Sequence, residues 1–320
     1  MTVLVTGGAG FIGSHLIDLL LEQGRDVVAF DRTRGRNLDR AGEQPAFRFV
    51  EGDIRDADAC SRLVAEADLV FHLSAVVGVG NYLADPLNVI DVNVIGTRNV
   101  IRAAVECDTR LVFTSTSEVF GRNPRVPWSE DDDRVLGSTS VDRWSYSTSK
   151  ALGEHMVLAA HGHHDLPVTV VRFFNAYGPR QAPGYVVSET VRRVLRGEPP
   201  LVYDGGKQTR CFTYVGDAVA GTLLAGASDA AIGEVFNIGS STETAIREAV
   251  ELVIEVSGTT IDAVDFVTSS EFGNVYEDID RRVPDTSKAQ RVLGWETSTS
   301  LREGVAQTLR WAEANPWWVG

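Results

Sequence analysis

Tyr146 and Lys150, in the run Tyr-Ser-Thr-Ser-Lys, form the pair of side chains in this chain best suited to chemistry. Residues four apart lie on one face of a helix, so a helix here places a phenol beside an ammonium group. A nearby cation favours the phenolate and is expected to lower the pKa of the tyrosine toward that of a general base near neutral pH. Many unrelated helices contain this spacing, so the rest of the sequence must decide whether the pair is functional.

A glycine-rich turn at the start of the chain predicts a binding site for the pyrophosphate of a dinucleotide. An apolar strand over residues 3–6 runs into Gly7-Gly8-Ala9-Gly10-Phe11-Ile12-Gly13 and then into an amphipathic helix. Gly7 permits a sharp turn, Gly10 permits close approach of the pyrophosphate, and Gly13 lets the helix pack on the strand. The free N–H groups at the start of the helix face the phosphates.

The second strand, over residues 27–30, ends in Asp31. A carboxylate at this position accepts hydrogen bonds from the adenosine ribose hydroxyls and repels a 2′-phosphate, which predicts NAD rather than NADP. Arg32, Arg34 and Arg36 follow at once and could tolerate a phosphate, so the sequence leaves NADP as an alternative.

Composition and charge narrow the class of protein. The chain has 320 residues, of which 43% are hydrophobic and 23% charged, as in a globular protein of one large domain or two modest ones. No apolar stretch reaches membrane-spanning length and no signal peptide is expected. Cys60, Cys107 and Cys211 have neither disulfide nor metal-ligand spacing, which predicts a reducing cytoplasm and no metal site. The net charge of −14 disfavours nucleic acid and anionic membranes as partners, so a local cluster of cations must hold any anionic substrate.

Strands and helices alternate along the first half of the chain, which predicts an α/β fold with a Rossmann-type, doubly wound parallel sheet. We expect this dinucleotide-binding domain over residues 1–175 and a smaller, loop-rich substrate domain over 176–320. Part of residues 211–258, namely a strand at 235–238 and a helix at 243–256, is expected to return to the main sheet. The other expected strands cover 47–50, 69–72, 111–113 and 168–171, and the expected helices cover 87–105 and 146–160.

Ligands of doubly wound sheets bind beyond the carboxyl ends of the strands. Asp53 follows the third strand and could accept a hydrogen bond from the adenine amino group. Leu73-Ser74-Ala75 follows the fourth strand and is small enough to let a dinucleotide pass. Hydroxyl groups over residues 114–117 follow the fifth strand and could share a substrate oxygen with Tyr146.

These motifs together resemble the extended short-chain dehydrogenase/reductases, the family of nucleotide-sugar epimerases, dehydratases and decarboxylases. The resemblance covers essentially the whole chain, through residues 6–13, 146–150, 171–180, 236–239 and 293–296. It implies an NAD that stays bound, a nucleoside-diphosphate sugar as substrate, and oxidation of the sugar's C4 hydroxyl by Tyr146. Lys150 would hold the nicotinamide ribose, Asn175 would contact the diphosphate, and Asn93 would order the active-site helix. The cofactor site expected from motifs and resemblance together comprises Gly7, Gly10, Phe11, Ile12, Gly13, Asp31, Arg32, Asp53, Ile54, Leu73, Ala75, Asn93, Thr114, Tyr146 and Lys150.

Within the family, residues 116–121 (Thr-Ser-Glu-Val-Phe-Gly) look like the corresponding run of UDP-glucuronate decarboxylases. Residues 81–86, 204–212 and 282–285 resemble segments of the same enzymes. The resemblance therefore implies a UDP-sugar substrate and loss of carbon dioxide, giving a UDP-4-keto-pentose, UDP-xylose, or both.

The chemistry of such a reaction explains these residue types. Oxidation at C4 of a glucuronate makes a β-keto acid, and carbon dioxide leaves because the new carbonyl accepts the electrons. Tyr146 and Thr116 can serve the carbonyl oxygen, and Ser117 and Glu118 can position the carboxyl group or a water. Arg210 can hold either the carboxylate or the diphosphate, and the sequence leaves this open. The expected substrate site comprises Tyr82, Thr116, Asn175, Tyr185, Arg210 and Arg282.

One position departs from the decarboxylase pattern. Those enzymes usually carry an arginine directly before the segment that matches Val186-Val187-Ser188, and this chain carries Tyr185. Loss of that cation predicts weaker retention of the keto-pentose, unless another arginine substitutes. The alternative activities are a UDP-sugar 4-epimerase, including one for UDP-glucuronate or UDP-glucose, and a 4,6-dehydratase, against which Ser117 counts. A non-catalytic NAD-binding regulator is a further alternative.

The resemblance also implies a homodimer. In the family's dimers, helices that match residues 87–105 and 146–160 pair as a four-helix bundle. We therefore expect Ile90, Val94 and Val157 to lie between two subunits in an isologous interface.

Overall fold

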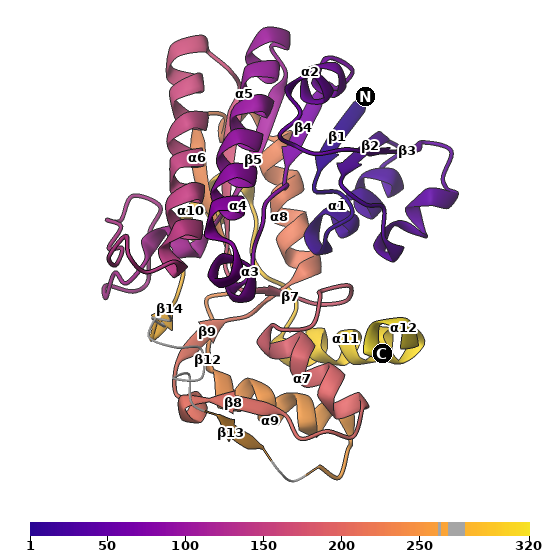
Figure 1. Ribbon diagram of the computed structural model, residues 1–320, viewed down its shortest axis with the longest axis vertical. Helices are drawn as coiled ribbons and strands as arrows, with labels where there is room; N and C mark the ends of the chain where they lie inside the picture. The colour runs from indigo at the N-terminus through magenta and orange to yellow at the C-terminus, as the bar shows by residue number, and fades with distance from the viewer. Residues whose placement is uncertain (262–263, 268–278) are drawn as a thin grey trace.

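A seven-stranded parallel sheet forms the centre of the protein (Figure 1). The computed structural model describes residues 1–261, 264–267 and 279–320. The strand order is β11-β6-β5-β4-β1-β2-β3, and every neighbouring pair is parallel, as the alternation of strands and helices predicts. The strands are β1 (Thr2–Thr6), β2 (Asp26–Asp31), β3 (Phe47–Glu51), β4 (Leu69–His72), β5 (Arg110–Thr116), β6 (Val168–Phe173) and β11 (Glu234–Ile238).

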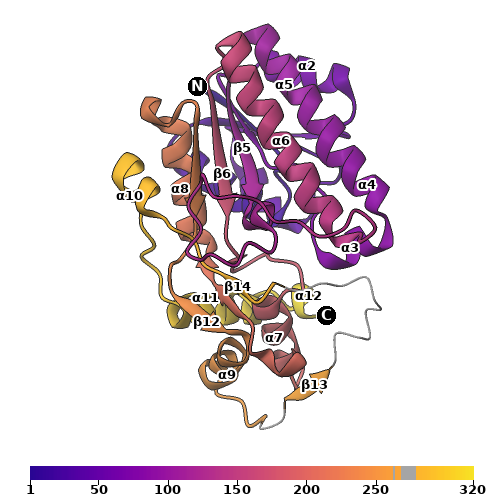
Figure 2. The same ribbon diagram turned by 90° about the vertical axis from the view of Figure 1, so that its left-hand side faces the viewer.

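Helices cover both faces of this sheet, because successive residues of a buried strand point to opposite sides and both sets are apolar. Val3 and Val5 of β1 lie in one apolar core, and Leu4 between them lies in the other. Figure 2 shows α5 and α6 on one side of the sheet and α8 on the other. The first face carries α2 (Ala57–Ala65), α5 (Gly96–Cys107) and α6 (Arg143–His164), and the second carries α1 (Phe11–Glu22), α8 (Val215–Ala227) and α10 (Ser287–Leu293).

The helix expected over residues 87–105 is three consecutive helical segments. They are α4 (Pro86–Ile90), a π-helical stretch (Asp91–Ile95) and α5, and the short helix α3 (Val79–Ala84) precedes them. A π-helical turn widens the helix locally and is frequent at functional sites. Here it carries Asn93 into the interior. Within the described ranges, no helix is long and apolar enough to cross a bilayer, and this includes the 22-residue helix α6.

A second, smaller layer lies below the carboxyl ends of the main strands in Figure 1. Its apolar core comes from α7 (Val186–Leu195), α9 (Ile246–Ser257) and α11 (Leu301–Ala314), with α12 (Pro316–Val319) at its edge. Short strands pair beside these helices: β7 (Ala176–Tyr177) with β10 (Thr213–Tyr214), β8 (Leu201–Tyr203) with β13 (Asp265–Val267), and β9 (Thr209–Cys211) with β12 (Glu243–Ala245) and β14 (Arg281–Arg282).

Two sequence expectations fail in this part of the fold. Strand β11 joins the main sheet beside β6 as expected, but the segment expected to be a helix over 243–256 begins with strand β12, and α9 does not return to the sheet. Ile246, Ala249 and Val253 give α9 an apolar stripe that packs against α7 and α11. Helix α8 covers the sheet instead.

A further expectation fails on the main sheet, at Val157 of α6. Its side chain is fully buried in the apolar core between α6 and the sheet, so it is not accessible to a second subunit. Ile90, by contrast, is 39% exposed, and Val94 is half-buried.

Candidate active site

Helix α6 carries Tyr146 and Lys150 on one buried face, next to the carboxyl end of β5. Asn93 anchors this helix, because its amide nitrogen donates to Ser149 Oγ at 3.0 Å. The Ser149 hydroxyl in turn donates to the Tyr146 carbonyl at 2.8 Å, and the Asn93 side-chain oxygen accepts the Val76 N–H at 2.9 Å. The π-helical turn, the loop after β4 and α6 are therefore joined through one side chain.

Tyr146 lies against an aromatic ring and a hydroxyl group that both come from other elements. Tyr82 of α3 stacks on it with ring centroids 5.8 Å apart and planes 15° from parallel. The Thr116 hydroxyl, at the end of β5, lies near the phenol and opposes the rise in its pKa. The structure thus brings together the phenol and the threonine that the sequence assigns to one substrate oxygen.

The expectation that Lys150 lowers the pKa of Tyr146 is wrong. Burial raises the pKa of Tyr146, and the negative charge of Glu118 raises it further, against the opposing effect of Thr116. Burial also lowers the pKa of Lys150, to about 7, and its ammonium lies 4.5 Å from the centroid of the Phe113 ring. Helical spacing correctly predicts the shared face, but the cost of burying charge outweighs any cation effect.

Three arginines surround Glu118, which follows β5. Glu118 Oε1 lies 3.1 Å from Arg282 Nη1 and 3.8 Å from Arg143 Nη2. Burial alone raises the pKa of Glu118, but Arg282, Arg143 and Arg210 outweigh that effect and lower the pKa overall, so the carboxylate is ionised. The sequence identified Glu118, Arg210 and Arg282 and missed Arg143, although an arginine three residues before the tyrosine lies on the same helical face.

Arg210 and Arg282 are neighbours in parallel strands β9 and β14. The Arg210 guanidinium donates to the carbonyls of Thr209 at 2.7 Å and Ile279 at 2.8 Å, so backbone contacts hold it in its orientation. Both arginine side chains are buried.

The glycine-rich turn fits a dinucleotide pyrophosphate. Gly7 has φ +70°, and a Cβ atom there would lie 2.7 Å from the Ser74 nitrogen. A Cβ atom on Gly13 would collide with the Gly7 carbonyl oxygen. Gly10 caps α1 without a side chain, and Phe11 and Ile12 begin the helix with no acidic residue in the first turn. The first N–H groups of α1 are thus available to an anion, as the motif predicts.

Asp31 lies at the end of β2 beside this turn. Its carboxylate accepts the Ala9 N–H at 3.0 Å and the Arg32 N–H at 2.7 Å, which fixes its orientation toward the loop. Burial raises its pKa, and both backbone hydrogen bonds oppose that shift. Arg32 is exposed, so its side chain is not held against Asp31 by packing.

The remaining cofactor residues lie along the same edge of the sheet. Asp53 forms an ion pair with Arg55 at 2.6 Å, and Ile54 packs with its side chain buried beside Gly96. Thr114 donates its hydroxyl proton to the His72 carbonyl at 3.0 Å. Leu73 and Ala75 are half-buried in the segment after β4.

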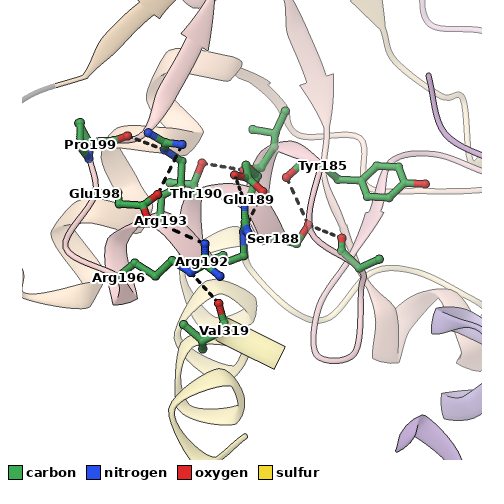
Figure 3. Close-up of polar contacts among 12 residues, drawn as sticks. Tyr185, Ser188, Glu189, Thr190, Arg192, Arg193, Arg196, Glu198, Pro199 and Val319 are labelled. Carbon is green, nitrogen blue, oxygen red and sulfur yellow. Dashed lines mark hydrogen bonds and ion pairs between the residues drawn. The ribbon is translucent and has the colours of Figure 1, made fainter. Parts of the chain in front are cut away.

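The expected substrate residues of the second layer face the same edge from below. Asn175, between β6 and β7, has φ +35°, and its side-chain oxygen is buried without a hydrogen-bond partner among the described residues. Tyr185 precedes α7, and its side chain extends away from the ion pairs of that helix, including Glu189–Arg192 at 2.6 Å (Figure 3). A Cβ atom on Gly78 would lie 3.2 Å from the Tyr185 hydroxyl, so this phenol reaches the loop after β4.

The chain matches the model of the NAD dependent epimerase/dehydratase family over residues 3–239, and it belongs to that family. The family, the fold class and NAD as the cofactor were all predicted from the sequence, and all three are confirmed.

Three relatives illustrate the range of activities in proteins similar to this chain. UDP-N-acetyl-alpha-D-glucosaminuronate decarboxylase of Bacillus cytotoxicus is 38% identical over 312 residues, which cover 96% of each chain. UDP-glucuronic acid decarboxylase 1 of Arabidopsis thaliana is 35% identical over 95% of this chain and 68% of its own. The crystal structure of UDP-glucuronic acid 4-epimerase from Bacillus cereus, in complex with UDP-glucuronic acid and NAD, has a TM-score of 0.88 at 29% identity and covers 98% of this chain and 99% of its own.

Proposed function

We propose that the protein is an NAD-dependent decarboxylase of UDP-linked sugar acids, with UDP-glucuronate as substrate and UDP-4-keto-pentose, UDP-xylose or both as products. The observation that carries this proposal is the buried group of three arginines around Glu118, next to Tyr146. A neutral hexose has no negative charge to place among these arginines. The two decarboxylase relatives support the proposal, because the substrate that each name specifies is a UDP-linked uronate.

The side chains of the site suit the steps of such a reaction. When bound, NAD supplies the two-electron oxidation at C4 and carries positive charge that favours the phenolate of Tyr146. Tyr146, with the Thr116 hydroxyl nearby, then accepts the proton of the C4 hydroxyl, which is general-base catalysis. After carbon dioxide departs, the same two groups stabilise the enolate oxygen. Ser117 and Glu118 position the carboxyl end, and Lys150 holds the nicotinamide ribose.

We further propose that residues 1–175 bind the dinucleotide and that 176–320, apart from α8, β11 and α10 on the main sheet, bind the nucleotide sugar. Asn175 suits the diphosphate, because its side-chain amide nitrogen can donate to phosphate oxygens and the residue lies in a turn of positive φ at the junction of the two layers. Tyr82 and Tyr185 would flank the sugar, and Arg210 and Arg282 would supply positive charge on the opposite side. The free state of Cys60, Cys107 and Cys211 supports a reducing compartment, which we propose is the cytoplasm.

The deciding experiment incubates the protein and NAD with UDP-glucuronate, UDP-N-acetylglucosaminuronate, UDP-glucose and dTDP-glucose, and follows products by mass. Loss of carbon dioxide from a UDP-uronate is the expected result. Conversion between two UDP-sugars of equal mass would instead establish the alternative of a 4-epimerase, which the similarity to the UDP-glucuronic acid 4-epimerase supports. Loss of water would identify a 4,6-dehydratase.

We also propose a homodimer that pairs the α4–α5 and α6 segments of two subunits. Leu87, Ile90, Ile95 and Leu152 lie on these adjacent helices and are 72%, 39%, 43% and 43% exposed. Large exposed apolar side chains gathered on neighbouring elements are a mark of protein interfaces.

A further inference from the structure

His72 lies at the centre of a buried chain of hydrogen bonds. It is the last residue of β4 and pairs with Thr6, the last residue of β1, which directly precedes the glycine-rich turn. Its Nδ1 atom lies 2.7 Å from Thr6 Oγ1, and its Nε2 atom lies 3.0 Å from Thr97 Oγ1 of α5. All three residues are at most 2% exposed. The steps proposed above give no role to His72 or to Thr97.

The neighbouring contacts fix which group donates at each step of this chain. The Thr97 hydroxyl donates to the Asn93 carbonyl at 2.6 Å, so its one proton is used and Thr97 Oγ1 accepts the N–H of His72 Nε2. Burial lowers the pKa of His72 to about 3, so the ring is neutral and Nδ1 is an acceptor. The Thr6 hydroxyl donates to Nδ1, and Thr6 Oγ1 in turn accepts the Ser74 N–H at 3.3 Å. Every step thus has one donor and one acceptor.

One end of the chain is the residue that anchors the helix of Tyr146. Asn93 belongs to the π-helical stretch, and its side chain donates to Ser149 Oγ at 3.0 Å. The Thr97 hydroxyl binds the Asn93 carbonyl within this stretch, where the backbone departs from α-helical geometry. The orientation of Asn93 therefore depends on Thr97, and the orientation of the Thr97 hydroxyl depends on His72.

The other end of the chain reaches the glycine-rich turn. Ser74 and Val76 follow β4, and their N–H groups donate to the side chains of Thr6 and Asn93. A Cβ atom on Gly7 would lie 2.7 Å from the Ser74 nitrogen, so this segment lies directly against the turn. Buried side chains thus connect the glycine-rich turn, the segment after β4 and helix α6.

We propose that His72 and Thr97 are positioning residues that fix the reactive position of Tyr146. Thr97 holds the π-helical stretch that carries Asn93, and Asn93 holds Ser149 of α6. The Ser149 hydroxyl donates to the Tyr146 carbonyl, which completes the connection. A displacement of about 1 Å in a reacting group can lower a rate about 100-fold. This inference rests on the proposed function for the reaction that reports it.

The test removes one hydroxyl group and keeps the β-branched shape of the side chain. In Thr97→Val loaded with NAD, we expect kcat for UDP-glucuronate to fall at least about fivefold, while KM and the Kd of NAD stay within about twofold. Thr97→Ser keeps the hydroxyl and should retain at least about half of wild-type turnover.

Thr222→Val is the matched control. Thr222 is 0% exposed, and its hydroxyl donates to the Ala218 carbonyl at 2.8 Å, which is also four residues earlier in a helix. It belongs to α8, on the other face of the sheet. Thr222→Val therefore loses the same kind of hydrogen bond as Thr97→Val, and it should lower stability without lowering kcat.

Three outcomes would overturn the proposal. They are a loss of kcat smaller than about fivefold in Thr97→Val, an equal loss in Thr97→Ser, and an equal loss in Thr222→Val. In the last two cases the loss would not come from the hydroxyl of Thr97. If Thr97→Val does not yield protein that binds NAD, Thr97→Ala is compared with Thr97→Ser by the same criterion, since alanine also lacks the hydroxyl and favours a helix.

A double-mutant cycle tests whether His72 acts through Thr97. His72→Leu should also lower kcat at least about fivefold, and the variant that combines it with Thr97→Val should lose at most about twofold more than the larger single loss. Losses that multiply would mean that the two residues act separately and would overturn the shared path. Full turnover in His72→Leu would overturn the role of His72.

Amide hydrogen exchange separates this inference from the proposed function. If the wild type releases no carbon dioxide from any UDP-uronate, the decarboxylase proposal fails. Exchange over residues 147–154 of α6, with α8 as the internal reference, still tests the chain of hydrogen bonds. We expect this relative exchange to be at least about fivefold faster in Thr97→Val than in wild type. Unchanged relative exchange would overturn the inference whatever reaction the enzyme performs.

Discussion

At the scale of single residues, burial governs the acid–base properties of the site. Tyr146 and Lys150 are both buried, and each is shifted toward its neutral form. A lysine four residues away therefore does not by itself make a tyrosine a base. Positive charge that a bound ligand brings must lower the pKa of Tyr146. The protonation of Tyr146 therefore depends on whether a ligand is bound.

Tyr146→Phe removes the proton acceptor and keeps the ring that stacks on Tyr82. Packing and NAD binding should survive, and turnover should fall by the general-base factor of roughly 10² to 10⁴. Steady-state product formation and NAD titration measure the two effects. A variant that keeps more than about a tenth of wild-type turnover would contradict the role of Tyr146.

Lys150 links stability to pH in the protein freed of dinucleotide. Burial lowers its pKa from the ordinary lysine value to about 7, so between that pH and its unfolded pKa the unfolded chain binds the extra proton. Its contribution to the free energy of unfolding therefore becomes less unfavourable as pH rises through this window. Lys150→Met removes this dependence.

We take the unfolding free energy of Lys150→Met minus that of wild type. This difference should be larger at about pH 6 than at about pH 9. Denaturant titrations at the two pH values measure this difference. Lys207→Met, at a residue outside the site whose side chain is exposed, is the control and should show no comparable change. Equal differences at both pH values for Lys150→Met would contradict the lowered pKa.

The sequence revealed only part of the arginine cluster. Helical spacing and the glycine-rich turn are local patterns, so Tyr146, Lys150 and Gly13 could be assigned from short windows of sequence. Arg143 acts on a glutamate 25 positions earlier and lies beside an arginine far along the chain, on β14. No local pattern contains that three-way contact, because the fold brings together residues that lie far apart in the sequence.

At the scale of elements, strands were more predictable than helices. The inner strands of the main sheet are buried on both faces and appear as short apolar runs, and β4 has the limits expected for it. An amphipathic helix shows only that one side is buried and not what buries it. That is why α9 was expected on the main sheet and packs instead against α7 and α11.

We expect Tyr185, at the junction between a loop and helix α7, to affect how firmly a keto-pentose is held. Its side chain reaches the loop after β4 and provides no cation there. We expect some UDP-4-keto-pentose among the products, with NADH accumulating in proportion, because a weakly held ketone dissociates before it is reduced. Tyr185→Arg should shift the product ratio toward UDP-xylose, as measured by mass and NADH absorbance.

Tyr185→Phe is the matched control for that substitution, since it keeps the ring and adds no charge. It should leave the ratio near that of wild type. If the wild-type protein already yields only UDP-xylose without accumulating NADH, another group replaces the missing cation and this reasoning about Tyr185 is wrong.

At the scale of the whole molecule, charge is distributed unevenly. The net charge is −14, yet a carboxylate beside Tyr146 is surrounded by three arginines. A net negative charge disfavours association with nucleic acids, so the positive charge near Tyr146 is a local feature that the net charge does not reveal.

The remaining property of the whole molecule is its oligomeric state, which we predict from the exposed side chains of α4 and α6. Leu87 and Leu152 are 72% and 43% exposed on helices that contact each other, so an isologous pairing would bury both residues twice. We expect the mass of a dimer in sedimentation at micromolar concentration. Leu87→Glu with Leu152→Glu should produce monomers, because burying carboxylates opposite each other is costly.

Leu224→Glu is the control, since Leu224 is 40% exposed but belongs to α8 on the other face of the sheet, and it should remain dimeric. Wild-type protein that sediments only as a monomer would refute the dimer, and a double variant that stays dimeric would refute this interface.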